Sequence, residues 1–402
     1  MEVGISIERA LEIASHSPLN FLVELIPIHE AHGRILSEPL ISKVDDPRFD
    51  NSAMDGWAVI ESDCNNPGSR LFISNIVQAG NTSSEVVVSG NACQIMTGAP
   101  MPIGANAIVM IEDSVIDGKH VIINGPARSN YIRKKGENIT KGEIGLESGI
   151  QLGPSELALA AMMGYSEIPV IIPPKIAIIG TGDELVEPGQ KLKPGQIYES
   201  NTTALVGLVK NMACEPVKYS FVKDDIDLLR DVFNLASDEC DAIITSGGVS
   251  MGEWDLVRRL MEDEGDMKFW KVLVKPGGPP LFGEWDSTPF FGLPGNPVSS
   301  QVIFHSIVAP WISNSCNFHD INGPNNVQKV RVKLLDQAFG TKNKITMRRI
   351  NIYFHEDNLV AQVPINQGSG NLRSLVDCNG LTLLPPNTNG NVGDIIDAFM
   401  FK

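Results

Sequence analysis

Hydrophobic positions between residues 175 and 313 alternate between continuous apolar runs and runs with helical spacing. The apolar runs, such as "KIAII", "DAIIT" and "PFFGL", are each followed by a glycine-containing turn. Four segments between or after these runs have the period of amphipathic helices: 201–213, 224–237, 253–265 and 296–312. The third segment predicts a helix that begins at "EWDLVRR". Strands that alternate with helices predict an α/β domain with a parallel sheet and crossover helices.

The pattern differs on both sides of this region. Residues 5–15 predict a helix with Ser6 as its N-cap, and a second amphipathic segment follows near Leu36. Short β-rich runs between residues 70 and 117 predict a small all-β or mixed module. A helix is expected over 152–165, and alternating runs after residue 322 predict a compact C-terminal β-barrel.

Composition sets limits on the class of protein. The chain has 402 residues, which predicts two to four domains, and its 43% apolar and 20% charged content is typical of a soluble globular protein. Its first residues lack the basic flank and apolar core of a secretory signal, so we expect a cytoplasmic protein without membrane spans. The six cysteines are far apart and form no CxxC, which favours buried reduced thiols over a zinc site or disulfides.

The formal net charge of -16 argues against a nucleic-acid partner. It does not exclude a small anionic ligand, because a local group of lysines and backbone amides can bind phosphate within an acidic protein.

Ligands of parallel α/β sheets bind beyond the carboxyl ends of the strands, and four loops meet that condition. In "TGDEL", Asp183 and Glu184 follow a strand; they are either an acidic turn or ligands for Mg²⁺. In "TSGGVSMGEWD", Ser246, Gly247, Gly248 and Ser250 expose backbone N–H groups that can hold an anion ahead of a helix, and Asp255 lies near that helix's start.

The other two loops carry lysines and a turn into a helix. Lys271 and Lys275 in "KVLVKPGG" are four residues apart, a spacing that puts both on one face of a strand. They favour anion binding over the solvated face of an edge strand. "GLPGNPVSS", with Pro294, Gly295, Asn296 and Ser299, is equally compatible with phosphate binding and with a tight packing turn.

Together the loops predict a crevice for a phosphorylated ligand with a divalent metal ion. Neither a P-loop nor a complete dinucleotide-binding GxGxxG is present, and the histidines are scattered without a predicted role.

An acidic segment lies far upstream of these loops. "DNSAMDGWAV" contains Asp50 and Asp55, and taken alone it predicts a turn with capping carboxylates rather than a catalytic group.

Seven motifs occur along the chain in this order: "DNSAMDGWAV", "IMTGAPMPIGANAIV", "KKGENI", "GTGDELVEPG…GQIYESN", "SGGVSMGEWD", "VLVKPGGPPLFG" and "FGLPGNPVS". Together they resemble the MoeA-type molybdopterin molybdotransferase family, which includes the E domain of gephyrin.

The resemblance implies an enzyme that inserts molybdenum from molybdate into adenylylated molybdopterin, with Mg²⁺, and releases AMP. It also implies a homodimer whose sites lie across the subunit interface, and contact with the molybdopterin adenylyltransferase.

Four domains are expected with it. They are an elongated linking domain of residues 1–45 plus 130–172, a small β-rich domain of 46–129, an α/β molybdopterin-binding domain of 173–320 and a C-terminal β-barrel of 321–402.

Residue roles follow motif by motif from the resemblance. Asp55 matches a catalytic acidic residue and Thr97 in "MTGAP" a site residue, while Glu184, Asp224 and Asp255 match acidic residues that face metal or ligand. Lys271 and Lys275 match the family's basic pair. Ser246, Gly247, Gly248 and Ser250 line its pterin and phosphate loop, and Ser369 and one of Arg348 or Arg349 reach the site from the C-terminal domain.

One motif departs from the family. The chain has "KPGGP" where the family often has KPGKP, so Gly278 replaces a lysine and removes a positive charge near the site.

Three other functions compete with this one: a tungstate-inserting paralogue, a non-catalytic molybdopterin-binding scaffold, and a competence/damage-inducible-type protein. The presence of Asp55, Glu184, Asp224 and Asp255 argues against the scaffold, and "NSAMDG" and "MTGAP" argue against the last.

Overall fold

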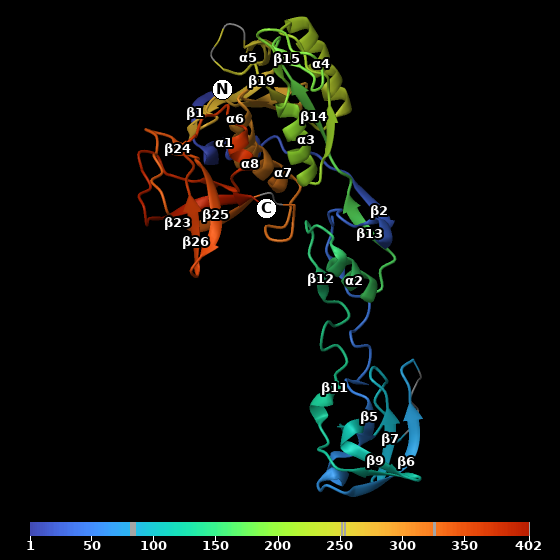
Figure 1. Cartoon of the computed structure of the whole chain (residues 1–402). Helices are drawn as coiled ribbons and strands as arrows, with labels where there is room; N and C mark the ends of the chain where they lie inside the picture. The colour runs from blue at the N-terminus through green and yellow to red at the C-terminus, as the bar shows by residue number, and fades with distance from the viewer. Residues whose placement is uncertain (81–85, 251, 253–254, 325–326, 402) are drawn as a thin grey trace.

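The protein is elongated, with its modules arranged along one long axis (Figure 1). The structure is a computed structural model that describes residues 1–80, 86–250, 252, 255–324 and 327–401. The α/β domain and the C-terminal barrel lie side by side at one end, and the small β domain lies at the other. Two passes of the chain form the narrow linking region between these ends, so the chain leaves the α/β end and returns to it.

A seven-stranded sheet in the order β1-β19-β21-β22-β18-β14-β17 forms the α/β domain. Its strands are β1 (Glu2–Ile5), β14 (Lys175–Gly180), β17 (Glu215–Lys218), β18 (Ala242–Ser246), β19 (Asp266–Val272), β21 (Leu281–Trp285) and β22 (Thr288–Leu293). The predicted parallel pairing is confirmed for β17, β14, β18 and β22.

β21 is an addition that the apolar pattern did not predict, and it runs antiparallel to both neighbours. Asp286 and Ser287 connect it to β22 with positive φ angles of 46° and 66°. Two consecutive residues with positive φ form the tight turn that suits a β-hairpin, so the sheet is mixed rather than wholly parallel.

Helices connect the strands as the helical spacing predicted. They are α3 (Asn201–Asn211), α4 (Ile226–Glu239), α5 (Leu256–Asp263), α6 (Pro297–Ile303) and α7 (Ala309–Ser315), with a π-helical segment, η5 (Phe304–Val308), between the last two. Asp225 caps α4, because its side chain accepts the N–H groups of Asp227 and Leu228. The predicted start of α5 at 253 lies outside the described residues.

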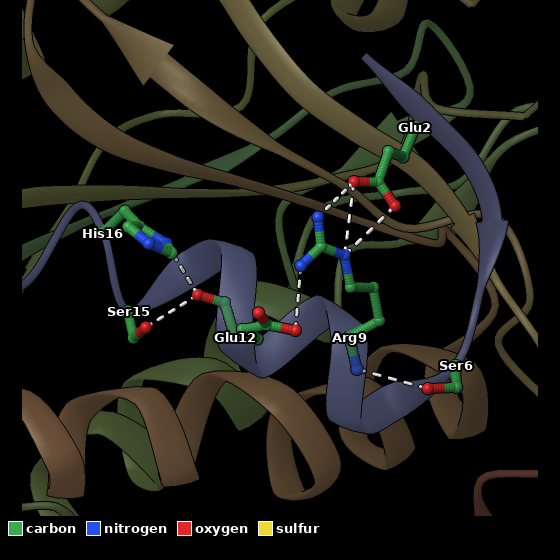
Figure 2. Close-up of polar contacts among 6 residues, drawn as sticks. All are labelled: Glu2, Ser6, Arg9, Glu12, Ser15 and His16. Carbon is green, nitrogen blue, oxygen red and sulfur yellow. Dashed lines mark hydrogen bonds and ion pairs between the residues drawn. The ribbon is translucent and has the colours of Figure 1, made fainter.

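The first residues of the chain are part of the α/β domain in the structure. The sequence had predicted residues 1–45 as part of the linking domain. β1 pairs in parallel with β19, and α1 (Ile7–Ala14) buries Ala10 and Ala14 in the core that covers the sheet. Figure 2 shows how polar contacts fix this helix: Ser6 accepts the N–H of Arg9, and Arg9 pairs with Glu2 and Glu12. The predicted cap at Ser6 is confirmed.

Short two-stranded pairings build the linking region. β2 (Val23–Pro27) pairs with β13 (Glu167–Ile171), β3 (Leu40–Ile41) with β12 (Ile144–Leu146), and β4 (Asn51–Ser52) with β11 (Ile132–Arg133). The predicted helix near Pro154 is confirmed as α2 (Pro154–Met162), which Glu156 caps by accepting the N–H of Gly153. The amphipathic segment near Leu36 has only a short 3-10 turn, η1 (Ile28–Glu30).

The small domain is built on a six-stranded sheet in the order β8-β5-β7-β6-β10-β9. Its elements are β5 (Gly56–Val59), η2 (Glu61–Cys64), β6 (Ser69–Val77), β7 (Asn91–Ile95), β8 (Ala107–Met110), η3 (Ile111–Asp113), β9 (Ser114–Asp117), β10 (His120–Ile123) and η4 (Ser129–Tyr131). At Gly56 a Cβ would lie 1.9 Å from the carbonyl oxygen of Val109. Only glycine therefore fits between β5 and β8, directly after Asp55.

The predicted C-terminal barrel is confirmed as the closed barrel β23-β26-β25-β27-β28. Its elements are β23 (Val327–Leu334), β25 (Arg349–His355), β26 (Asn358–Gln362), α8 (Arg373–Val376), β27 (Gly380–Thr382) and β28 (Ile395–Phe401). Met347 and Leu381 share one buried cluster with Phe291 of the α/β sheet. β24 (Ile345–Thr346) also pairs with β20 (Val274–Lys275), so the barrel is packed firmly beside the sheet.

The six cysteines are all buried, as expected, and none forms a disulfide in the structure. Within the described ranges, no helix combines the length and apolar character that crossing a membrane requires.

Candidate functional site

A cavity of about 1080 Å³ opens at the carboxyl edge of the α/β sheet. Loops after β14, β18 and β22, which are neighbours in the sheet, line its floor. The barrel lines it from the other side with residues 346–349 and 367–370. The cavity therefore lies at the edge where the rule for ligands of parallel strands predicts a binding site.

Most of the residues that the sequence singled out line this one cavity. They are Glu184, Asp224, Ser246, Gly247, Gly248, Ser250, Asp255, Lys275, Pro294, Gly295, Asn296, Ser299, Arg348, Arg349 and Ser369. Asp55, Thr97 and Lys271 do not line it.

The loop Ser246–Ser250 has the geometry of an anion-binding loop. Its carbonyl oxygens are held by other groups: Gly248 accepts from the Arg258 N–H, Val249 from the Trp270 indole and Ser250 from the Arg258 guanidinium. Positive φ angles of 107° and 66° at Gly247 and Gly248 make the turn possible. Within the described part of the chain, the N–H groups of residues 248–250 have no acceptor, so they can bind an anion in the cavity.

Carboxylates also line the cavity. The pKa of Asp224 is raised above its ordinary value, first by burial and then by the negative charge of Asp183, with further contributions from Glu184 and Asp255. Such mutual repulsion is relieved by a cation, and oxygen donors are the ligands that Mg²⁺ prefers.

No group of three or more potential metal ligands is assembled among the described residues. The carboxylates therefore fit a cation whose coordination is completed by ligand oxygens, and they do not form a full protein cage.

Lys271 and Lys275 do not share one strand face, so the spacing argument was wrong. β19 ends at Val272 and β20 begins at Val274, and Lys271 has a positive φ of 68°. The Lys271 ammonium lies 3.9 Å from the ring centre of Trp270, whereas Lys275 lines the cavity. Because the strand is interrupted between the two lysines, their side chains lie in different surroundings.

The barrel brings two arginines and a loop to the cavity. Arg349 is only 1% exposed, and its guanidinium donates to the carbonyl oxygen of Gly368 at 3.0 Å and to the Ser374 hydroxyl at 3.0 Å. Ser369 is held in turn by its carbonyl oxygen, which accepts the N–H of Val298 in α6. Arg349 thus supports the loop that carries Ser369, and Arg348 is the less buried of the two arginines lining the cavity.

Asp55 and Thr97 lie together on the small domain, at the far end of the same chain (Figure 1). Asp55 accepts hydrogen bonds from both the N–H and the hydroxyl of Thr97. These bonds hold the pKa of Asp55 below its ordinary range, the N–H contributing most. Both residues are exposed, so the pair presents a fixed, ionised carboxylate to whatever faces this surface.

Several lining residues were not assigned a role from the sequence. Tyr198, Glu199 and Asn201 reach the cavity from "IYESN", and Thr181 and Thr346 contribute buried hydroxyls without a hydrogen-bond partner in the described structure. The sequence signal that could have indicated these residues is the polar run between a short strand, β16 (Ile197–Tyr198), and the start of α3.

Gly278 stands where the family often has a lysine, and another lysine of this chain lies close to it. A Cβ added to Gly278 would lie 3.5 Å from the Lys344 ammonium, which comes from the C-terminal part of the chain. The departure from KPGKP therefore does not leave this corner without a positive charge.

Comparison with known families covers nearly the whole chain. Residues 5–164 match the family described as "MoeA N-terminal region (domain I and II)", residues 177–314 match "Probable molybdopterin binding domain", and residues 331–401 match "MoeA C-terminal region (domain IV)".

Individual proteins agree with these matches. The chain is 35% identical to the molybdopterin molybdenumtransferase of Haemophilus influenzae, over 93% of this chain and 92% of that protein. It is 33% identical to molybdopterin molybdenumtransferase 2 of Mycobacterium tuberculosis, over 90% of each chain. The crystal structure of the molybdopterin biosynthesis moeA protein from Pyrococcus horikoshii superimposes with a TM-score of 0.85 at 29% identity, covering 99% of this chain and 100% of that one.

Proposed function

The chain belongs to the MoeA family, and from that premise we propose that it inserts molybdenum from molybdate into adenylylated molybdopterin and releases AMP. One observation carries the proposal: a single cavity combines backbone N–H groups that lack an acceptor among the described residues, a lysine and arginines with a cluster of carboxylates. Phosphates need the first set, and a divalent cation needs the second. The relatives' names give the molybdopterin substrate.

The anion-binding side of the cavity receives the phosphates in this proposal. The N–H groups of Gly248 and Ser250 and the Lys275 ammonium bind the terminal phosphate and the pyrophosphate oxygens. Arg348 adds a cation from the barrel. Because these donors are held by the fold before the ligand arrives, they stabilise the charge that develops on the departing adenylate without reorganisation.

Glu184, Asp224 and Asp255 are the residues that would hold magnesium, and oxygens of the ligand would complete its coordination. The cation would supply electrostatic stabilisation of the leaving phosphate. The chain's own residues supply position: the Asp224 N–H donates to the side chain of Asp183, and Asp255 accepts the N–H of Gly252, so both loops are fixed. Molybdate is an oxyanion substrate and binds on the cationic side.

Asp55 and Thr97 complete the site from a second copy of the chain. Within one chain they lie on the small domain, away from the cavity, and neither lines it. An exposed, oriented carboxylate on the small domain of an elongated molecule is well suited to reach the cavity of a partner in a homodimer. We assign Asp55 a catalytic role there, with Thr97 as the residue that orients it.

The cytoplasm is the compartment in which we expect this reaction. A second protein, the molybdopterin adenylyltransferase, must supply an adenylylated substrate of this kind, so we propose contact with it.

AMP release tests the function. Purified protein is incubated with adenylylated molybdopterin, molybdate and Mg²⁺, and AMP is measured over time. We expect AMP from the wild type, loss of AMP when EDTA removes the magnesium, and tungstate as a competing second oxyanion. Molybdopterin that binds while adenylylated substrate stays intact would support a binding scaffold instead.

Asp55→Asn tests the assignment across the interface. We expect unchanged molybdopterin binding and AMP release slower by roughly 10²-fold or more. Asp63→Asn is the matched control, because Asp63 also accepts a backbone N–H on the small domain, from Gly90, and has no role in the cavity. Mixed dimers of Asp55→Asn and Lys275→Ala chains should regain part of the activity, since each dimer keeps one intact composite site; no recovery would place Asp55 outside the site.

A further inference from the structure

Asn201, the first residue of α3, joins two of the loops that line the cavity. Its side-chain nitrogen lies 2.8 Å from the Ser246 hydroxyl oxygen and 2.8 Å from the carbonyl oxygen of Gly295. Ser246 begins the anion-binding loop after β18, and Gly295 belongs to the loop after β22. One side chain from a third loop therefore sets the separation of the other two.

The carbonyl of Gly295 fixes the orientation of the Asn201 amide. A carbonyl oxygen only accepts hydrogen bonds, so the amide atom beside it must be the nitrogen. The same nitrogen is beside Ser246, where its second hydrogen is donated to the hydroxyl oxygen. In both bonds the Asn201 nitrogen is therefore the donor, and the oxygens of Ser246 and Gly295 are the acceptors.

This direction determines what the Ser246 hydroxyl can do. Its oxygen accepts from Asn201, so its own hydrogen must point elsewhere. Ser246 is 3% exposed, lines the cavity and has no acceptor for that hydrogen among the residues that the structure describes. The hydroxyl is consequently available as a donor to an acceptor oxygen of a bound ligand, in the same loop as the unpaired N–H groups.

We propose that Asn201 is a positioning residue that keeps the Ser246 hydroxyl as a hydrogen-bond donor to the anionic ligand. The inference rests on the proposed function for the identity of the ligand, a phosphorylated pterin. Asn201 acts through Ser246 and Gly295, and it performs no chemical step itself.

Asn201→Asp is the most informative variant because it has the same shape with the opposite hydrogen bonding. An ionised aspartate cannot donate, so it accepts the Ser246 hydrogen and turns the hydroxyl away from the ligand. It also places a carboxylate beside the Gly295 carbonyl. Helix stability is not at risk, since a negative charge is favourable in the first turn of α3.

The controls separate this effect from charge and from folding. Asn211→Asp makes the same change at the exposed last residue of α3, away from the cavity. Asn201→Ala removes the donor without adding an acceptor. Melting temperatures of all variants show that each is folded.

Binding of molybdopterin and of pyrophosphate is titrated from about pH 7.5 down to about pH 4.5, the range in which a perturbed aspartate protonates. Relative to wild type, we expect binding at the upper pH weaker by about 10-fold or more for Asn201→Asp and by about 3-fold for Asn201→Ala. Protonation restores one O–H donor, so the Asn201→Asp deficit shrinks as the pH falls, while the Asn201→Ala deficit stays constant and Asn211→Asp follows the wild type.

Equal deficits in both variants without a change in pH dependence would overturn the inference, as would binding by Asn201→Asp within about twofold of wild type at the upper pH. Failure of the proposed function has a different signature. The wild type would then bind pyrophosphate, with the variant pattern above, and release no AMP from adenylylated molybdopterin.

Discussion

The Asp55 carboxylate accepts two hydrogen bonds from one residue, Thr97: its backbone N–H at 2.6 Å and its hydroxyl at 2.9 Å. β5 and the loop after β7 bring the two residues together, and Gly56 allows the close strand pairing beside them. Both bonds favour the ionised form, which lowers the pKa of Asp55. The carboxylate is therefore charged and oriented although it is exposed.

Thr97→Val should raise the pKa of Asp55 toward its ordinary value, because the hydroxyl bond is lost and the N–H bond remains. The stability that a lowered carboxyl pKa contributes is present above about pH 4 and is lost as the pH falls through the folded-state pKa, so the variant loses it at a higher pH. Carboxyl-carbon NMR titration measures the shift. Thr140→Val is the matched control, since Thr140 donates in the same way to Glu143; it should raise the pKa of Glu143 and leave Asp55 unchanged.

Asp224→Asn should stabilise the protein at neutral pH while it impairs the reaction. The pKa of Asp224 is raised in the folded state, so the ionised carboxylate costs stability at pH values above that pKa. We expect the melting temperature to rise by about 1 to 2 °C at neutral pH, and the gain to disappear near about pH 3, where the wild-type carboxyl is protonated in both states. Asp231→Asn, an exposed change on α4, should do neither. A gain that is independent of pH would contradict the electrostatic explanation.

Trp270→Phe should weaken anion binding without unfolding the α/β domain. The indole N–H donates to the carbonyl oxygen of Val249 at 3.1 Å, and the Lys271 ammonium lies over the ring. Phenylalanine keeps a ring and loses the donor, so the loop of residues 246–250 becomes less well held. We expect pyrophosphate affinity to fall by about 3- to 10-fold, as measured by calorimetry.

Trp285→Phe is the comparison for that variant. Trp285 is also buried in this domain and donates to Asn234 at 2.9 Å, but it does not line or support the cavity. It should lose stability of about 1 kcal/mol and keep the wild-type affinity. The same loss of affinity in both variants would mean that general loosening of the domain, and not the loop, is responsible.

Thr181→Val should separate a ligand contact from a packing role. The Thr181 hydroxyl is buried and has no hydrogen-bond partner among the described residues, and Thr181 lines the cavity. Thr245→Val is the matched control, because the Thr245 hydroxyl is also buried without a partner among the described residues, and Thr245 does not line the cavity. Valine has nearly the same shape, so both substitutions should leave stability unchanged or raise it by up to about 1 kcal/mol. Only Thr181→Val should also raise the Kd for molybdopterin; unchanged binding would limit Thr181 to packing.

The hydrophobic pattern predicted much of the fold because local period and burial are closely related. The strand before "TGDEL", the helix capped by Asp225 and the C-terminal barrel all follow from side-chain spacing. β21 was overlooked because Gly283 and Glu284 interrupt its apolar run, and the turn at Asp286 and Ser287 is what reveals the hairpin. The prediction that Lys271 and Lys275 share a face was wrong because alternation of side chains holds only along a continuous strand. The strand is interrupted at Leu273.

By itself, the sequence determined the modules, the loops that meet at the sheet edge and, through its ordered motifs, the family. Those features depend on residues close together in the chain, where spacing and turn chemistry act directly. Tertiary structure alone decided that Arg349 supports the Ser369 loop, that Asn201 orients Ser246, and that Asp55 lies far from the cavity of its own chain. These relationships join segments that are distant in sequence, and packing between domains, which has no local signal, sets their geometry.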